Sequence, residues 1–163
     1  MGRFPEKHSE LLDHVNAGTI KGLNWYISDH DTIADGNTVE FGFSGIETPP
    51  LISIKLYASN EATMTLYEGA DFSGGTTLTS RNRNRNKSDG NSMDVVRDPT
   101  VSSNGTDIGA DAGGASRGLG FEFGSKDVKA LVFEKNTDYL LSITSNSNEN
   151  IISWLFEWTE DVY

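Results

Sequence analysis

The chain has 163 residues, with 13 Lys and Arg against 24 Asp and Glu, so its formal net charge is −11. It has no cysteine, which excludes disulfides and thiolate metal sites, and its acidity argues against a nucleic-acid partner because phosphates would be repelled. The start is unlike a signal peptide and no run approaches the ~20 apolar residues of a membrane span, so the sequence predicts a soluble protein made in the cytoplasm, with no membrane partner.

Residues 1–23 differ from the rest of the chain. His8, Leu11, Leu12 and Val15 follow the i, i+3, i+4, i+7 spacing of a helix, and Gly18 is a plausible stop. The segment predicts an N-terminal arm or one short helix, too brief to be stable alone. It must therefore pack on the body or on a partner, and its apolar residues are candidate interface residues. They are Phe4, Leu11, Leu12 and Val15.

From Asn24 onward apolar residues alternate with polar ones, the pattern of strands that bury one face. Gly, Asn and Ser turns separate the runs. We predict an all-β fold, an antiparallel β-sandwich of jelly-roll type that forms a single domain over 24–163. The inward residues are Val39, Phe41, Phe43, Ile52, Ile54, Leu56, Met64, Leu66, Leu119, Phe121, Phe123, Leu131, Phe133, Tyr139, Leu141, Ile143, Ile152, Trp154, Phe156 and Trp158.

Residues 69–117 break this pattern. The segment is rich in Gly, Asn, Ser and Asp and carries few apolar residues, so we expect a long polar loop region. A loop of this length inside a compact domain is usually functional or mobile.

No catalytic motif is present. The chain has no G-x-S-x-G, H-E-x-x-H or P-loop pattern, and its three histidines all fall within the first thirty residues. We therefore predict a protein that is not an enzyme and has no cofactor.

The stretch "SDHDTIADGN" suggests calcium, but the EF-hand register fails, because Gly42 stands where a bidentate Glu is required. A looser loop of Asp29, Asp31 and Asp35 is one interpretation. A polar turn between two strands is the preferred one, so no metal is predicted.

The tryptophans divide into two groups. Trp154 and Trp158 share the parity of Ile152 and Phe156, which indicates core or subunit-interface positions. Trp25 and Tyr26 belong to no clear alternating run, and they are candidates for stacking on a sugar.

The stretch "RNRNRNK" puts Arg81, Arg83, Arg85 and Lys87 within seven residues of an acidic chain. If it is extended, the arginines project to one face and Asn82, Asn84 and Asn86 to the other. The arginines would then pair with carboxylates of a neighbouring subunit, which their planar fork suits, and the asparagines would bond main-chain groups. A solvated loop and a nucleic-acid contact are the alternatives, and the interface is favoured.

The same region carries a resemblance. "TLYEGADFSGGTTLTSRNRNRNKSD", the step at Pro99–Thr100, "GADAGGASRG", "EKNTDYLLSITSN" and "SWLFEWTE" follow one another as in a pattern frequent among structural proteins of tailed bacteriophages. The amino end, "HVNAGTIKGLNWYIS", also resembles the opening of such proteins. The resemblance spans most of the chain, and the "LYEG…RNRNR" pairing is its distinctive part.

This resemblance implies a virion structural protein that decorates or cements the phage head. Such proteins are commonly trimeric β-sandwiches seated on the capsid lattice. The expected partners are other copies of the chain, as a homotrimer, and the major capsid protein. The expected location is the head surface, with Arg81, Asn82, Arg83, Asn84 and Arg85 at the interface. The alternative is a glycan-binding β-sandwich module of a phage fibre or tail-associated protein.

Overall fold

The computed structural model describes residues 19, 21–87, 90–91, 93–113, 120–123 and 131–160. For residues 120–123 it describes the backbone alone. The expected N-terminal arm, with Phe4, Leu11, Leu12 and Val15, lies outside the described residues except at its carboxyl end. Within the described residues there is no helix of the length and apolarity that crossing a membrane requires.

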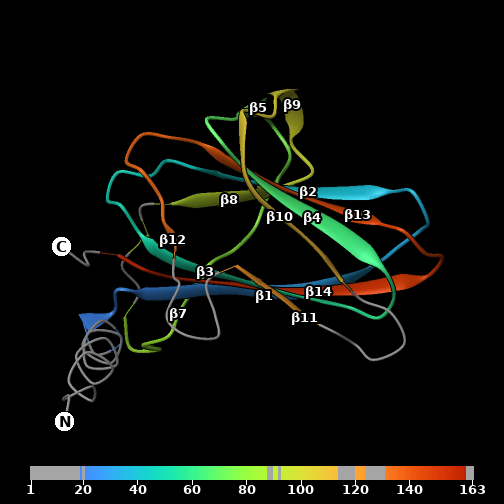
Figure 1. Ribbon diagram of the computed structural model, residues 1–163. Helices are drawn as coiled ribbons and strands as arrows, with labels where there is room; N and C mark the ends of the chain where they lie inside the picture. The colour runs from blue at the N-terminus through green and yellow to red at the C-terminus, as the bar shows by residue number, and fades with distance from the viewer. Residues whose placement is uncertain are drawn as a thin grey trace, which may run out of the picture.

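Strands make up nearly all of the regular structure (Figure 1). They are β1 (Asn24–Ile33), β2 (Thr38–Ser44), β3 (Leu51–Ala58), β4 (Ala62–Glu68), β5 (Asp71–Ser73), β6 (Thr76–Thr77), β7 (Arg81–Asn82), β8 (Asp94–Arg97), β9 (Thr100–Ser103), β10 (Thr106–Gly113), β11 (Gly120–Phe123), β12 (Leu131–Val132), β13 (Tyr139–Ser145) and β14 (Asn150–Thr159).

The strands form two stacked antiparallel sheets. The first has the order β11-β3-β14-β1-β7, with β12 also pairing with β3, and the second has the order β10-β4-β13-β2-β8-β6. Without the short strands β6, β7, β8 and β12, these are the two four-strand sheets of a jelly roll, in which most connections cross from one sheet to the other. The predicted antiparallel, jelly-roll-like sandwich is therefore confirmed.

The core lies between the sheets and follows the predicted alternation. Every second residue of β2, β3, β4, β13 and β14 is buried, because side chains alternate across a strand. Aromatic rings join the layers. The ring centroid of Phe41, in the second sheet, lies 4.9 Å from that of Trp154 and 5.0 Å from that of Phe156, both in the first sheet. The ring centroids of Phe43 and Phe156 are 5.3 Å apart. Such pairs contribute ~0.5–1.5 kcal/mol each beyond their burial.

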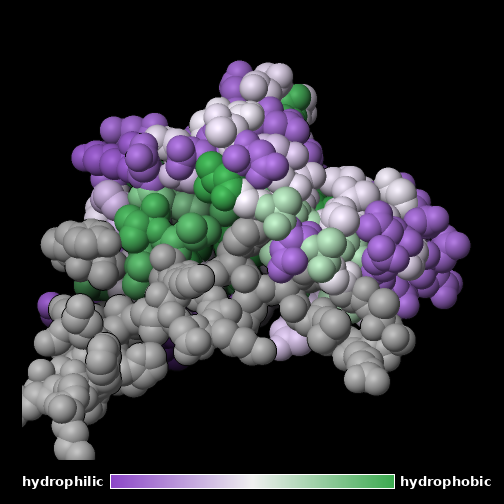
Figure 2. Space-filling model, in the orientation of Figure 1, coloured by the Kyte–Doolittle hydropathy of each residue, from purple (hydrophilic) through white to green (hydrophobic). Residues whose placement is uncertain are grey.

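Figure 2 shows one flank of this sandwich. Apolar surface lies between hydrophilic areas at the top and at the right of the view.

In place of a long polar loop over 69–117, the structure has β5 to β10. The chain leaves β4 along β5 and β6, turns at β7, and returns along β8 and β9 to β10. Pairing of β5 with β9 and of β6 with β8 makes this excursion a long, bent hairpin. Its strands have two to four residues before β10, too short for an alternating pattern to be visible in the sequence. We call residues 69–105 the bridging hairpin.

The base of the bridging hairpin lies on the outer face of the second sheet (Figure 1, top). Phe72 of β5 packs on Gly42 of β2, so closely that a Cβ built on Gly42 would stand 2.4 Å from its ring. Leu140 of β13, paired with Gly42, is fully buried although it lies on this outer face. The absence of a side chain at position 42 therefore lets the hairpin dock.

Gly42→Ala should lower the free energy of unfolding by ~1–3 kcal/mol, because the new methyl group overlaps the Phe72 ring. Urea unfolding measures this change. Gly90→Ala is the matched control, since a Cβ there meets nothing within 4 Å. In a Phe72→Ala background the Gly42→Ala change should cost much less. An undiminished cost there would show that Phe72 does not set the requirement for glycine.

Candidate functional site

The arginine-rich segment forms the tip of the bridging hairpin. Only its first two residues are a strand, β7, in which Asn82 lies opposite Trp25 of β1 and Arg81 lies opposite Tyr26. Residues 83–86 form bends and a turn. The expectation that the whole segment is extended, with every arginine on one face, is therefore wrong beyond Asn82.

The asparagines explain this departure. Asn82 is buried, its side-chain amide donates to the Gly22 carbonyl at 2.6 Å, and its Oδ1 accepts from the Asn84 backbone N–H at 2.8 Å. Asn84 Oδ1 accepts in turn from the Asn86 N–H at 3.1 Å. An asparagine that bonds the backbone two residues on curls the chain into a turn. Asn82 and Asn84 thus bond main-chain groups as predicted, but by the same bonds they end the strand.

Arg83 is engaged inside the chain. Its guanidinium pairs with Glu157 of β14 and lies over the Tyr26 ring, 5.5 Å from the centroid. Lys55 of β3 also pairs with Glu157, at 3.2 Å. Arg83 therefore ties the hairpin tip to the outer face of the first sheet, and it is not available in this state to a partner's carboxylate.

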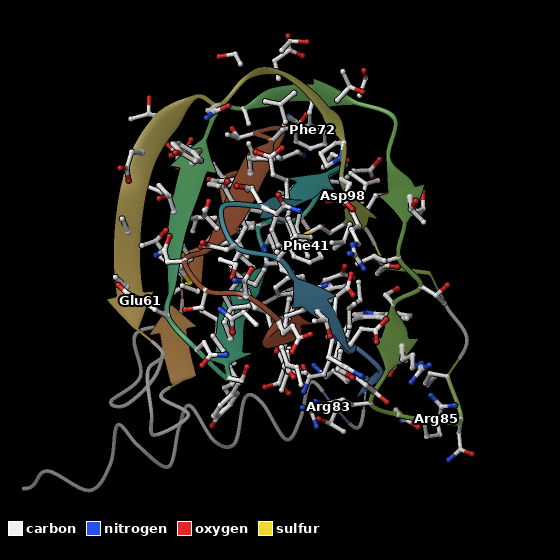
Figure 3. All side chains as sticks on the ribbon, turned by 90° about the vertical axis from the view of Figure 1, so that its right-hand side faces the viewer. Phe41, Glu61, Phe72, Arg83, Arg85 and Asp98 are labelled. Atoms are coloured by element: carbon white, nitrogen blue, oxygen red, sulfur yellow. The ribbon has the colours of Figure 1, made fainter. Side chains whose placement is uncertain are left out.

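Arg81 and Arg85 differ from Arg83. Both are exposed, as is Lys87, and among the described residues none of the three forms an ion pair. They surround an open hollow of ≈ 260 Å³ that is lined by Trp25, Ser80, Arg81, Asn82, Arg85 and Lys87. We call this hollow the tip pocket. Figure 3 shows Arg83 and Arg85 on the lower side of the molecule, with Arg85 farther to the right.

The acidic stretch near the start of the sandwich is split between a strand and a turn. Asp29 and Asp31 belong to β1, whereas Asp35 lies in the turn before β2. The two strand carboxylates accept hydrogen bonds from neighbouring backbone N–H groups of His30 and Thr32. No cluster of three side chains able to hold a metal occurs within the part of the chain that the structure describes.

Asp31 has a partner that sequence reasoning missed. Arg97 of β8 pairs with Asp31 across the gap between the sheets, pairs with Asp98 at 3.1 Å, and lies over the Trp154 ring, 5.4 Å from its centroid. The Arg97 guanidinium holds the pKa of the Asp31 carboxyl below its usual value. Only the hairpin path brings residues 31 and 97 together, so no local pattern could reveal the pair.

The two residues expected to stack on a sugar, Trp25 and Tyr26, both make ring contacts within the chain. Trp25 is only 6% exposed and belongs to the core, so its ring cannot stack on a ligand as predicted. One face of Tyr26 is covered by Arg83. Trp154 and Trp158 are buried in the core, as their parity predicts.

No family model matches the sequence, and no curated protein matches it. A solved structure described as "Bacillus endospore appendages form a novel family of disulfide-linked pili" is similar with a TM-score of 0.34 and 11% identity, over 85% of this chain and 91% of that one. The structure of infectious bursal disease virus Gx strain is similar with a TM-score of 0.13 and 11% identity, over 81% of this chain and 41% of that one. The crystal structure of the infectious bursal disease virus VP2 subviral particle is similar with a TM-score of 0.14 and 11% identity, over 83% of this chain and 41% of that one. Similarities this weak carry no conclusion about function.

Asn82→Asp should destabilise the protein by ~1–3 kcal/mol, because it removes the donor to Gly22 and buries a carboxylate against that carbonyl. The Arg83 amide, which donates to the Asn24 carbonyl at 2.8 Å, should also exchange its hydrogen faster. Urea unfolding and amide hydrogen exchange measure the two effects. Asn86→Asp, the same change at an exposed position, is the control. Equal losses in both variants would contradict the role given to Asn82.

Asp31→Asn should lower the free energy of unfolding at neutral pH by less than ~1 kcal/mol, because the ion pair with Arg97 is partly exposed to solvent. The folded-state pKa of Asp31 lies below its usual value of 3.8, so the contribution is complete above that value. It is lost as the pH falls through the lowered pKa. Unfolding across the acid range should therefore show wild type and variant converging. Asp35→Asn in the exposed turn should change little, and a gap that persists in acid would refute the assignment.

Proposed function

We propose that this protein is a structural protein of a tailed-bacteriophage virion that decorates or cements the head. On this proposal it acts by burying surface against the major capsid protein and against other copies of itself, as a homotrimer. It sits on the head surface and has no catalytic role.

The observation that carries the proposal is the "LYEG…RNRNR" stretch, which resembles a pattern of such proteins. In the fold this stretch is continuous structure. It runs from the end of β4, through the near half of the bridging hairpin, to the tip. This distinctive part of the resemblance thus leads from the end of β4 to one exposed feature.

The geometry supports a contact role for that feature. The tip stands at the end of an excursion anchored on both sheets, through β8 on β2 and β7 on β1. A rigidly held, exposed group loses little conformational freedom when it binds, which favours a stable subunit contact. The glycan-binding alternative has no comparable support, because Trp25 lies in the core.

The proposal is tested on virions of the phage that encodes the chain. Mass spectrometry of purified particles should find the protein in a fixed ratio to the major capsid protein, and gold-labelled antibody should mark the head. Particles made without the protein should bind the purified chain when it is added, as sedimentation would show. Absence from the particle, or labelling confined to the tail, would overturn the proposal.

Light scattering of the purified protein tests the oligomer separately. A trimer whose mass falls at high salt is the expected result, because charged subunit contacts are screened by salt. A monomer at every salt concentration would remove the homotrimer from the proposal. It would leave attachment to the capsid to be judged by the sedimentation experiment.

A further inference from the structure

We infer that the tip pocket is a binding site for the carboxylates of an acidic protein segment supplied by a partner, with Arg81, Arg85 and Lys87 as the groups that hold them. Arg83 has a different task, since it fixes the tip to the sandwich. The inference rests on the proposed function only for the identity of the partner.

The chemistry of the pocket fits a carboxylate. Arg81, Arg85 and Lys87 all line one hollow of ≈ 260 Å³. Each guanidinium can hold a carboxylate by two parallel, charge-assisted N–H···O bonds, which are among the strong hydrogen bonds that side chains form. The volume suits one or two carboxylate side chains rather than a folded surface.

The two other arginines that the structure describes both have internal partners. Arg83 pairs with Glu157, and Arg97 pairs with Asp31 and Asp98. In a chain with 24 Asp and Glu, internal partners are abundant, yet none is placed against Arg81, Arg85 or Lys87 among the described residues. Three like charges in one hollow repel each other, and an external anion relieves this repulsion.

The pocket is held in shape before any ligand arrives. The Arg83 amide donates to the Asn24 carbonyl at 2.8 Å, and the Lys87 amide donates to the Asn84 carbonyl at 2.9 Å. The Lys87 side chain lies against Gly22, where a Cβ would stand 2.7 Å from its Cγ. The floor consists of Trp25 and Asn82, both buried. Binding therefore requires ordering of the three cationic ends but not of the backbone that carries them.

The net charge distinguishes among anions. A nucleic acid presents one negative charge per ~1.7 Å of duplex and would extend past the pocket over a protein surface of net charge −11. A short acidic segment places its charges in the pocket alone. We therefore assign the pocket to protein carboxylates, with phosphate binding as an outcome that the experiment can detect.

The test uses the full chain labelled with nitrogen-15 and a hexaglutamate peptide as the probe. Addition of the peptide should shift the amides of residues 80–87 and the Arg81 and Arg85 side-chain Nε signals. Affinity should fall as salt rises from about 50 mM to about 300 mM, because the charges are screened. A hexaglutamine peptide should cause none of these shifts.

Variants identify the groups. Replacing both Arg81→Gln and Arg85→Gln should weaken hexaglutamate binding by about tenfold or more, since two charge-assisted contacts are lost. The amide spectrum away from the tip should stay the same, because neither side chain has an ion partner among the described residues. Lys135→Gln, at an exposed turn between β12 and β13, removes a charge without touching the pocket and should leave binding unchanged.

Three results would overturn the inference. These are no shift at residues 80–87, equal weakening by Lys135→Gln, and tighter binding of inorganic phosphate or a single-stranded oligonucleotide than of hexaglutamate at the same residues. The failure of the proposed function can be told apart from the failure of this inference. If the protein binds the peptide but is absent from virions, the phage proposal is wrong and the carboxylate site still stands. If the Arg81→Gln, Arg85→Gln double variant still attaches to capsids in normal amounts, the tip pocket does not take part in capsid attachment.

Discussion

The open edge between β1 and β2 is the constraint on which the rest of the structure depends. Two stacked sheets bury their inner faces against each other, but along this edge the rings of the core would meet water. The bridging hairpin covers the edge. Met93 and Val95 are buried there, β8 extends the second sheet, and β7 extends the first. Arg97 completes the closure, since its guanidinium lies over Trp154 and reaches Asp31 on the opposite sheet. Covering the edge of a sandwich in this way also removes a site for unwanted strand pairing.

The closure of this edge determines where the cationic groups stand. Phe72 docks on Gly42 and sets the course of the hairpin over the second sheet. Asn82 then anchors its far end through the Gly22 carbonyl and curls the chain that follows. The tip pocket is thus built on a core interaction at one end and a buried hydrogen bond at the other. A group held by both is placed more firmly than one on a free loop.

Neighbouring arginines of one short repeat serve different purposes. Arg83 shares Glu157 with Lys55 and rests on Tyr26, so its charge is satisfied within the chain. Arg81 and Arg85 keep their charges exposed beside Lys87. Because the turn after Asn82 breaks the alternation of side chains, adjacent odd-numbered positions no longer share a face. The repeat therefore combines an internal anchor with exposed cations, and the assignment of the tip pocket rests on this division.

The sequence by itself determined the sandwich, because strands that bury one face must alternate, and β2, β3, β4, β13 and β14 are long enough to display it. It also indicated core or subunit-interface positions for Trp154 and Trp158, and it drew attention to the segment from Arg81 to Arg85. Only the tertiary structure decided what the polar region 69–105 does. Strands of two to four residues carry no period, and their partners are far away in the chain. For the same reason the pairing of Asp31 with Arg97 and the burial of Trp25 could not be predicted. Each depends on a contact between segments some sixty residues apart, which only the path of the hairpin brings together.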